Sequence, residues 1–412
     1  MDSPRHAIRL NRSLRLVCLT ISCLFVCAML PTWAGPGGKG GGGKNTDPPP
    51  GLIEAPVVYV ISRIEWSELT ESFSLQDVNA SGDAIGRCRP VDSSGNIAIL
   101  VNTEGLRIPL HDLFDVETAF PGWRFNHASC INEAGDVAGV LVPEDQSSSS
   151  SSTEHRIVLG NVYADPPTLT ELAWYVDGLP FGDFVDVSDM NERGDVIVGV
   201  RINGENQSRV HKAPVSGVSA LYEVELSQNP LSVGAASLND AGQVAVSARI
   251  SKRKTHLFIH SIDSTLPDLD LGSYGYSAHI SQGGAVYSET YTNGIDANNT
   301  DTPQRWSPLT GQWNVIASPG DIVALSKAEA GEEALIRGYS GEPSRPFLWV
   351  YKDPIGTYPL EVTGNQEDVE LWKNDQTGIG ISGISRPITL ANGANHGYMA
   401  GNLRMDGVVR GF

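Results

Sequence analysis

Residues 189–199 read Asp-Met-Asn-Glu-Arg-Gly-Asp-Val-Ile-Val-Gly, and this pattern returns along the chain. In each clear copy an apolar residue precedes Asn, and Gly follows Asn by three positions. Asn starts tight turns through a side-chain hydrogen bond to the backbone, and Gly adopts the positive φ that ends them. The residues after Gly alternate, so that Val196, Val198 and Val200 share one face, which is the period of a strand. The pattern therefore predicts a β-hairpin.

Seven copies of the pattern recur at intervals of about 52 residues, the length of one supersecondary unit. Their anchor glycines are Gly82, Gly135, Gly194, Gly242, Gly284, Gly331 and Gly397. Roughly four strands fit one period, so residues 52–412 are predicted to form a single all-β domain, a β-propeller of seven four-stranded blades. Six or eight blades are the alternatives. Residues 57–61 and 408–412 are expected to complete one blade together, which would close the propeller with its N- and C-terminal strands.

The remaining strands of each period are predicted from short apolar or aromatic runs bounded by turn residues. Third strands are expected at residues 96–101, 155–159, 256–260 and 346–351, and fourth strands at residues 106–110, 169–172 and 266–271. No helical pattern of comparable length interrupts this order.

The repeat resembles the HAF repeats of extracellular bacterial proteins. The resemblance rests on the Asn-x-x-Gly-Asp/Gln-Val core, on the strand His-Leu-Phe-Ile-His at residues 256–260, and on Leu-Asp-Leu-Gly-Ser-Tyr-Gly at residues 269–275. It covers most of the chain after residue 52 and implies secretion and a β-propeller-like fold. It implies no catalytic residue.

The N-terminus has the three parts of a signal peptide. Four arginines precede an apolar run of about 15 residues, which is too short for a comfortable transmembrane span, and small residues follow at Thr32 and Ala34. Residues 1–34 are therefore predicted to be removed on export, and residues 35–51, rich in Gly and Pro, to form a flexible linker. The mature protein is expected to be extracellular or periplasmic, without a membrane anchor.

The charge balance excludes a nucleic-acid partner. The chain has 29 basic and 48 acidic residues, a formal charge of −19, which becomes −22 once residues 1–34 with their four arginines and one aspartate are removed. Such a surface repels nucleic acid and keeps a protein soluble. We expect a monomer.

Two cysteines, Cys88 and Cys130, remain after the predicted cleavage. Cys88 ends one predicted hairpin and Cys130 begins the next, so a disulfide between neighbouring blades and two free thiols are both open alternatives.

The oxygen-bearing residues Asp77, Asn79 and Ser81 invite comparison with a calcium loop. An EF-hand loop requires a bidentate acid at its twelfth position, which here is Cys88, so an Asn-Gly turn is favoured and calcium in one repeat is the alternative. No other cofactor or metal site is expected, because the local signatures of hydrolases, zinc enzymes and nucleotide binders are missing. No catalytic residue is assigned.

Arginine recurs seven positions after the anchor Gly in four copies, at Arg89, Arg201, Arg249 and Arg404. Equivalent positions in a propeller lie at equivalent heights, so these side chains are candidates for a partial positive ring that binds an anionic glycan or a carboxylated ligand. The alternative is that they end their strands and face solvent.

Two functions follow from these patterns. The first is a secreted, non-catalytic propeller that binds a protein or glycan through its loop face or central channel. The second is a polysaccharide hydrolase or lyase with carboxylates at the channel mouth, since a sequence does not reveal which distant carboxylates meet.

Overall fold

The structure is a computed structural model, and part of the chain is described in it. The described residues are 58–61, 70–91, 95–144, 155–172, 184–202, 205–212, 220–224, 226, 230–252, 254–262, 267–273, 277–290, 302–316, 320–325, 333–340, 345–352, 356–359, 361–366, 369–370, 380–384, 388–389, 395–396, 398–405 and 408–411. The chain divides into two units, Met1–Gly51 and Leu52–Phe412. The predicted signal peptide and linker lie outside the described residues.

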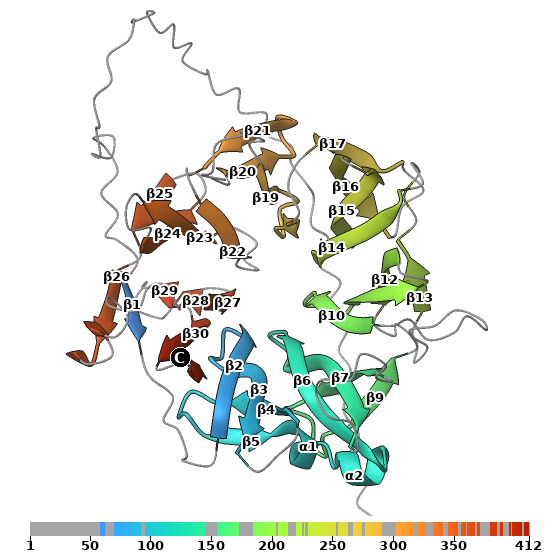
Figure 1. Ribbon diagram of the computed structural model, residues 1–412, viewed down its shortest axis with the longest axis vertical. Coiled ribbons are helices and arrows are strands. Elements are labelled where there is room, and N and C mark those ends of the chain that lie inside the picture. The colour runs from blue at the N-terminus through green and yellow to red at the C-terminus, as the bar shows by residue number, and fades with distance from the viewer. Residues whose placement is uncertain are drawn as a thin grey trace, which may run out of the picture. The chain divides into compact units, whose positions relative to one another are not determined.

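Six four-stranded antiparallel sheets follow one another along the second unit, and in each the strands pair in sequence order (Figure 1). Sheet 1 comprises β2 (Thr70–Val78), β3 (Ala84–Pro90), β4 (Ile97–Val101) and β5 (Arg107–Pro109). Sheet 2 comprises β6 (Trp123–Ile131), β7 (Asp136–Pro143), β8 (Arg156–Asn161) and β9 (Leu169–Leu172). Sheet 3 comprises β10 (Phe184–Met190), β11 (Val196–Ile202), β12 (Glu205–Lys212) and β13 (Ala220–Glu223).

The next three sheets have the same order. Sheet 4 comprises β14 (Ser232–Leu238), β15 (Gln243–Ser251), β16 (Lys254–Ser261) and β17 (Leu269–Ser273). Sheet 5 comprises β18 (His279–Ile280), β19 (Val286–Thr290), β20 (Thr302–Ser307) and β21 (Gln312–Val315). Sheet 6 comprises β22 (Gly320–Leu325), β23 (Glu333–Ser340), β24 (Arg345–Lys352) and β25 (Gly356–Pro359). Such four-stranded units are those from which propeller blades are built.

The remaining elements are shorter. A C-terminal sheet contains β27 (Gly380–Ile384), β30 (Met399–Met405) and β31 (Val408–Gly411), and a hairpin pairs β28 (Ile388–Thr389) with β29 (Asn395–His396). Two one-turn helices, α1 (Leu110–Leu113) and α2 (Val116–Ala119), connect sheets 1 and 2. The expected all-β class is confirmed, and the predicted third and fourth strands agree with the observed ones to within a few residues.

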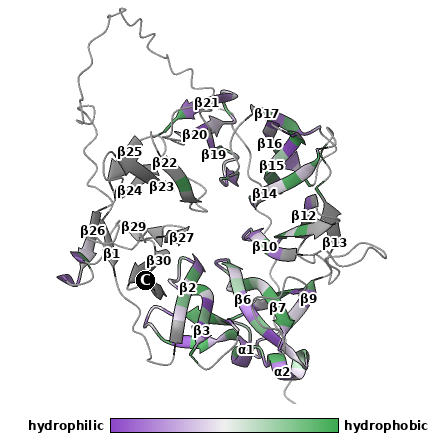
Figure 2. Cartoon of the chain, in the orientation of Figure 1, coloured by the Kyte–Doolittle hydropathy of each residue, from purple (hydrophilic) through white to green (hydrophobic). Residues whose placement is uncertain are grey.

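The hydrophobic core lies between consecutive sheets. Ile85 and Leu100 of sheet 1 form a buried cluster with Phe125 and Leu141 of sheet 2. Equivalent clusters join sheets 2 and 3, sheets 3 and 4, and sheets 4 and 5. Figure 2 shows the hydrophobic residues of these strands in green. Because both faces of an intermediate sheet are covered, its strands carry runs of buried residues, as β11 does at Val196, Ile197 and Val198.

A β-bulge precedes the Asn-Gly turn in sheets 1, 2 and 3 and explains the second glycine of the motif. The pairing of β2 with β3 skips Gln76, and that of β6 with β7 skips Ser129. A Cβ at Gly86 would lie 2.1 Å from the carbonyl oxygen of Ser74, and one at Gly139 would lie 2.4 Å from that of His127. Glycine is therefore required beside the bulge in sheets 1 and 2, whereas in sheet 3 a Cβ at Gly199 would lie 3.4 Å from the Oγ atom of Ser188, an ordinary contact.

The first strands of the sheets contact one another in sequence. β2 contacts β6, β6 contacts β10, β10 contacts β14, and β14 contacts β18. Sheets 5 and 6 meet through β19 and β22, β22 contacts β27, and β27 contacts β2. The contacts between sheets thus lead from sheet 1 through the C-terminal sheet and back to sheet 1.

The prediction that the N-terminal and C-terminal strands share one blade is wrong. β1 (Val58–Ile61) pairs in parallel with β26 (Glu361–Gly364), whereas β31 pairs with β30 inside the C-terminal sheet. Only two residues separate β30 from β31 in the sequence, so this hairpin closes at little entropic cost, which a pairing between the two chain ends does not share.

Tyr398, which directly precedes β30 of the C-terminal sheet, packs against the first Asn-Gly turn. Gly82 has φ +82°, and a Cβ there would lie 2.6 Å from the Cζ atom of Tyr398 and 2.4 Å from the Cγ2 atom of Thr103. Gly105 offers a matched site, because its φ is +76° but a Cβ there would meet no atom within 4 Å.

We expect Gly82→Ala to reduce the free energy of unfolding by about 1–3 kcal/mol more than Gly105→Ala does. Both substitutions strain a left-handed residue, but only the first displaces Tyr398. Urea denaturation of both variants measures the difference, and in a background with both Tyr398→Ala and Thr103→Ser, which removes the two side-chain atoms nearest to the new Cβ, the cost of Gly82→Ala should fall toward that of Gly105→Ala. Equal costs in the original background would show that the contact with Tyr398 contributes nothing.

Burial of His211 on β12 makes the stability depend on pH. Burial lowers the pKa of His211 to about 4, and it also lowers the pKa of His279, where nearby Asp189 opposes the effect. The unfolded chain then binds protons that the folded protein does not, so the free energy of unfolding is highest above about pH 6.5 and decreases toward pH 4.

For His211 alone this loss amounts to roughly 3 kcal/mol. We expect His211→Gln to remove a corresponding part of the decrease between pH 6.5 and pH 4, measured as urea midpoints at several pH values. An unchanged pH dependence in this variant would contradict the assignment to His211.

Candidate functional site

Each Asn of the repeated motif organises its own turn. The side-chain oxygens of Asn79, Asn132, Asn191 and Asn239 each accept a hydrogen bond from the backbone N–H four residues later, at 2.8–3.0 Å. In sheet 5 the hydroxyl of Ser281 accepts the same bond from Ala285. The four asparagines are almost fully buried. The Asn-Gly turn predicted from the sequence is confirmed.

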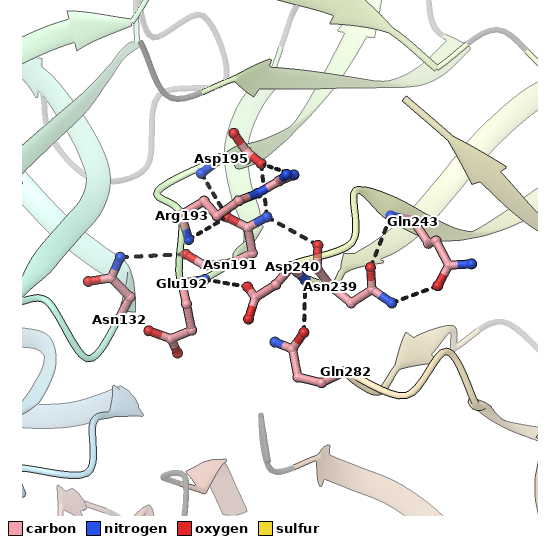
Figure 3. A network of polar contacts seen from close by, with 9 residues as sticks. All are labelled: Asn132, Asn191, Glu192, Arg193, Asp195, Asn239, Asp240, Gln243 and Gln282. Atoms are coloured by element: carbon pink, nitrogen blue, oxygen red, sulfur yellow. Dashed lines mark hydrogen bonds and ion pairs between the residues drawn. The ribbon is translucent and has the colours of Figure 1, made fainter. Parts of the chain in front are cut away.

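The same side chains also connect each turn to the next sheet. The Nδ2 group of Asn191 donates to the carbonyl oxygen of Asn239 at 3.1 Å (Figure 3). The Nδ2 group of Asn239 donates in turn to the carbonyl of Ser281 at 3.1 Å. Asn79 donates to Asn132 at 3.4 Å, and Asn132 donates to Asn191 at 3.5 Å. We call Asn79, Asn132, Asn191, Asn239 and Ser281 the Asn belt, and the end of the sheets that carries it the turn end.

A second row of bonds uses the residue after each belt position. The backbone N–H of Glu133 donates to a carboxylate oxygen of Glu192 at 2.9 Å, and the N–H of Glu192 donates to Asp240 at 2.8 Å. The row begins with Ala80 bonded to Glu133 and ends with Asp240 bonded to Gln282, as Figure 3 shows in part. The repeated acidic residue after Asn was the signal for this row, which the sequence analysis did not use.

A third row precedes the belt. The Oδ2 atom of Asp77 accepts the backbone N–H of Ile131 at 3.0 Å, and the Oδ2 atom of Asp189 accepts that of Leu238 at 2.8 Å. The hydroxyl of Ser237 donates to Asp189 and accepts the N–H of Ile280 at 3.3 Å. Asp77 and Asp189 directly follow a bulge, which directs their side chains toward the next sheet.

Both Nδ2 hydrogens of each belt asparagine are donated. The second Nδ2 hydrogen of Asn191 is donated to Asp195 at 2.9 Å, and Asn239 donates in the same way to Gln243. The oxygens of Asp77 and Asn79 that a calcium ion would need already accept backbone N–H groups. The donor set of this turn therefore fits a hydrogen-bonded junction better than a calcium site.

Polar residues on the first strands form a separate group. The Nε2 atom of His127 on β6 lies 3.0 Å from a carboxylate oxygen of Asp186 on β10, and its Nδ1 atom lies 3.1 Å from the amide of Asn126. His127 is mostly buried, while the Asp186 side chain is 40% exposed. This pair joins sheets 2 and 3 and presents a carboxylate to solvent.

The four candidate arginines lie on strands at the end of the sheets opposite the Asn belt, which we call the arginine end. Arg89 on β3 pairs with Ser72, Arg201 on β11 with Phe184, and Arg249 on β15 with Ser232. Arg404 lies on β30. Arg249 is exposed and Arg89 is half-buried, and the side chains of Arg201 and Arg404 are outside the described part. The three register-matched arginines lie on second strands, not on the first strands that contact one another.

Cys88 and Cys130 are free thiols in the structure. Cys88 packs beside the cluster of sheet 1 that includes Phe73 and Tyr398, whereas Cys130 belongs to the cluster between sheets 2 and 3. The two side chains thus face different neighbours, and the disulfide that their sequence positions allowed is not formed. Burial raises the pKa of the Cys88 thiol, with Arg107 opposing this effect.

Among the described residues, no group of three or more His, Cys, Asp or Glu side chains is arranged to hold a metal ion. Within the same residues no helix has the length and apolar character needed to cross a bilayer.

No family model and no curated protein sequence matches the chain. Among solved structures, the β-propeller domain of the Trilobed protease from Pyrococcus furiosus is 12% identical, with a TM-score of 0.43 over 67% of this chain and 77% of that one. An oligogalacturonate lyase in complex with manganese is 10% identical, with a TM-score of 0.46 over 82% of this chain and 88% of that one. A puromycin hydrolase is 12% identical, with a TM-score of 0.40 over 84% of this chain and 62% of that one.

The contribution of the Asn belt to stability can be tested by comparing Asn191 with Asn102. Asn102, in the β4–β5 turn, accepts the N–H groups of Glu104 and Leu106 as a belt residue accepts those of its own turn, but its bonds stay within that turn, whereas Asn191 also bonds to the next sheet. We expect Asn191→Ala to lower the free energy of unfolding by about 3 kcal/mol and Asn102→Ala by about 1 kcal/mol, because only Asn191 leaves buried partners unpaired in the next sheet.

Equilibrium urea denaturation of the two variants measures this difference. Similar losses would place the stabilisation in the local turn and would contradict a role of the belt amides between sheets.

Proposed function

We propose that the protein is an exported, seven-bladed β-propeller of the HAF-repeat type that binds an anionic glycan or a carboxylate-bearing protein at its arginine end. The C-terminal sheet is the seventh blade in this proposal. The contacts that lead from sheet 1 through the C-terminal sheet back to sheet 1 support it, as does the packing of Tyr398 on Gly82. The apolar run before residue 30 supports export.

Binding is favoured over catalysis because the polar side chains of the repeated motif bond to the neighbouring sheet and so stabilise a rigid scaffold. The acidic and amide side chains that recur in every clear copy are used as acceptors and donors between neighbouring sheets. Residues engaged in this way hold a scaffold in place and leave the loops at either end to carry recognition. A preorganised scaffold also reduces the entropy lost on binding.

The observation that carries the ligand class is the matched register of the arginines. Arg89, Arg201 and Arg249 stand opposite corresponding residues of the first strands, in a protein with 29 basic and 48 acidic residues. Arginines repeated at one register position suit the carboxylates of a polyuronate, whose negative charges also repeat along the chain.

We expect the mature protein to bind oligogalacturonate, with affinity falling steeply between 50 and 200 mM salt because the attraction is electrostatic. The Arg89→Ala/Arg249→Ala variant should bind at least about tenfold more weakly, since each substitution removes one charge-assisted contact. Isothermal titration calorimetry measures both effects.

Arg193→Ala is the matched control, because Arg193 lies at the turn end, where its guanidinium bonds to Asp195 at 2.6 Å. Its affinity for the polyuronate should stay within about twofold of the original. Undiminished binding by the double variant, or no binding of any polyanion by the original protein, would overturn the proposal.

A second candidate, cleavage of a polysaccharide, is favoured by the exposed carboxylate of Asp186 beside His127. Release of new reducing ends or unsaturated products in the same mixtures distinguishes it from binding alone.

A further inference from the structure

Tyr163, in the turn between β8 and β9, is a large aromatic side chain displayed on the surface. It is 49% exposed, and it is the one aromatic residue among the strongly exposed large hydrophobic residues of the described part. Its turn lies at the turn end, because the N–H of neighbouring Val162 donates to the carbonyl of Gly135. An exposed aromatic ring keeps apolar surface in contact with water and forgoes the free energy of burial. A large aromatic side chain on the surface therefore indicates a binding role.

The ring is held firmly in place. One side packs on Gly135, where a Cβ would lie 2.2 Å from the Cδ2 atom of Tyr163. The phenol oxygen accepts the Nδ2 group of Asn79 at 2.9 Å and donates to a carboxylate oxygen of Asp83, and the backbone N–H of Tyr163 donates to Asn161 at 2.9 Å. The ring thus spans sheets 1 and 2 and keeps a fixed orientation.

Polar groups surround this fixed ring. Asn161 donates to the carbonyl of Ala134 and to Asp136, each within 2.9 Å, and Ser81 beside Asp83 is exposed. Carboxylate, amide and hydroxyl groups next to an aromatic face complement a sugar ring, which has an apolar C–H face and a rim of hydroxyl donors and acceptors. The carboxylates of Asp83 and Asp136 disfavour an anionic sugar here, so the matching class is a neutral one.

We propose that Tyr163 is the stacking platform of a second binding site, at the turn end, for a neutral hexopyranose glycan. The immobilised ring requires no ordering when a sugar binds, which favours recognition by a small contact area. This site deepens the proposed binding function and rests on it, but it uses the opposite end of the sheets from the arginines.

The test uses titration calorimetry and saturation-transfer NMR with neutral hexasaccharides, namely cellohexaose, maltohexaose and mannohexaose, on the mature protein. At least one should bind in the micromolar to millimolar range. Tyr163→Leu, which keeps an apolar contact with Gly135 but removes the ring, should weaken binding at least about tenfold. Tyr163→Phe should bind within about threefold of the original, since it keeps the stacking face.

Leu309→Ala is the matched control. Leu309 is 95% exposed and lies in the corresponding turn between β20 and β21 of sheet 5, so its loss should leave the affinity unchanged. No binding of any neutral hexasaccharide, or equal binding by Tyr163→Leu, overturns this inference. If oligogalacturonate still binds through Arg89 and Arg249 in that case, the proposed function stands and only the second site fails.

Discussion

The buried amide of the belt asparagines is the interaction on which the arrangement of the sheets depends. A single Asn side chain accepts the N–H that closes its own turn and donates to the carbonyl of the turn in the next sheet. An ionised aspartate has no donor for the next sheet, and at Ser281 a hydroxyl takes over the local acceptor role toward the N–H of Ala285. Because these groups are buried, each unmade bond would cost the desolvation of both partners, and the turns are therefore fixed relative to one another.

Three parallel rows of hydrogen bonds give successive sheets a common register. Within four consecutive residues, Asp189 and Asn191 bond to the backbone of the next sheet, and the backbone N–H of Glu192 donates to the side chain of Asp240. The hydrophobic clusters between sheets supply most of the buried apolar area but little directional information. The polar rows supply this directional information, so that the Asn-Gly turns of successive sheets lie at one end, while Arg89, Arg201 and Arg249 lie toward the other.

The turn end and the arginine end of the sheets therefore carry different side chains. The turn end carries carboxylates engaged with backbone N–H groups and the fixed ring of Tyr163, whereas the opposite end carries Arg89 and Arg249. Both ends are presented by turns and strand termini of a scaffold whose interior is packed. The proposals for an anionic ligand at one end and a neutral glycan at the other follow from that separation.

The sequence alone determined the hairpin, the strand order within each sheet and the all-β class, because Asn-Gly turns and alternating residues are local signals. It also located the recurrent arginines. Only the tertiary structure decided that β1 pairs with β26, that Cys88 and Cys130 face different clusters, and that Asn and Glu of the motif bond to the next sheet. The bonds between belt residues join positions 42 to 59 residues apart, and the pairing of β1 with β26 joins positions farther apart still. Which residues meet over such separations depends on how the sheets pack, and the spacing of residues along the chain does not encode this.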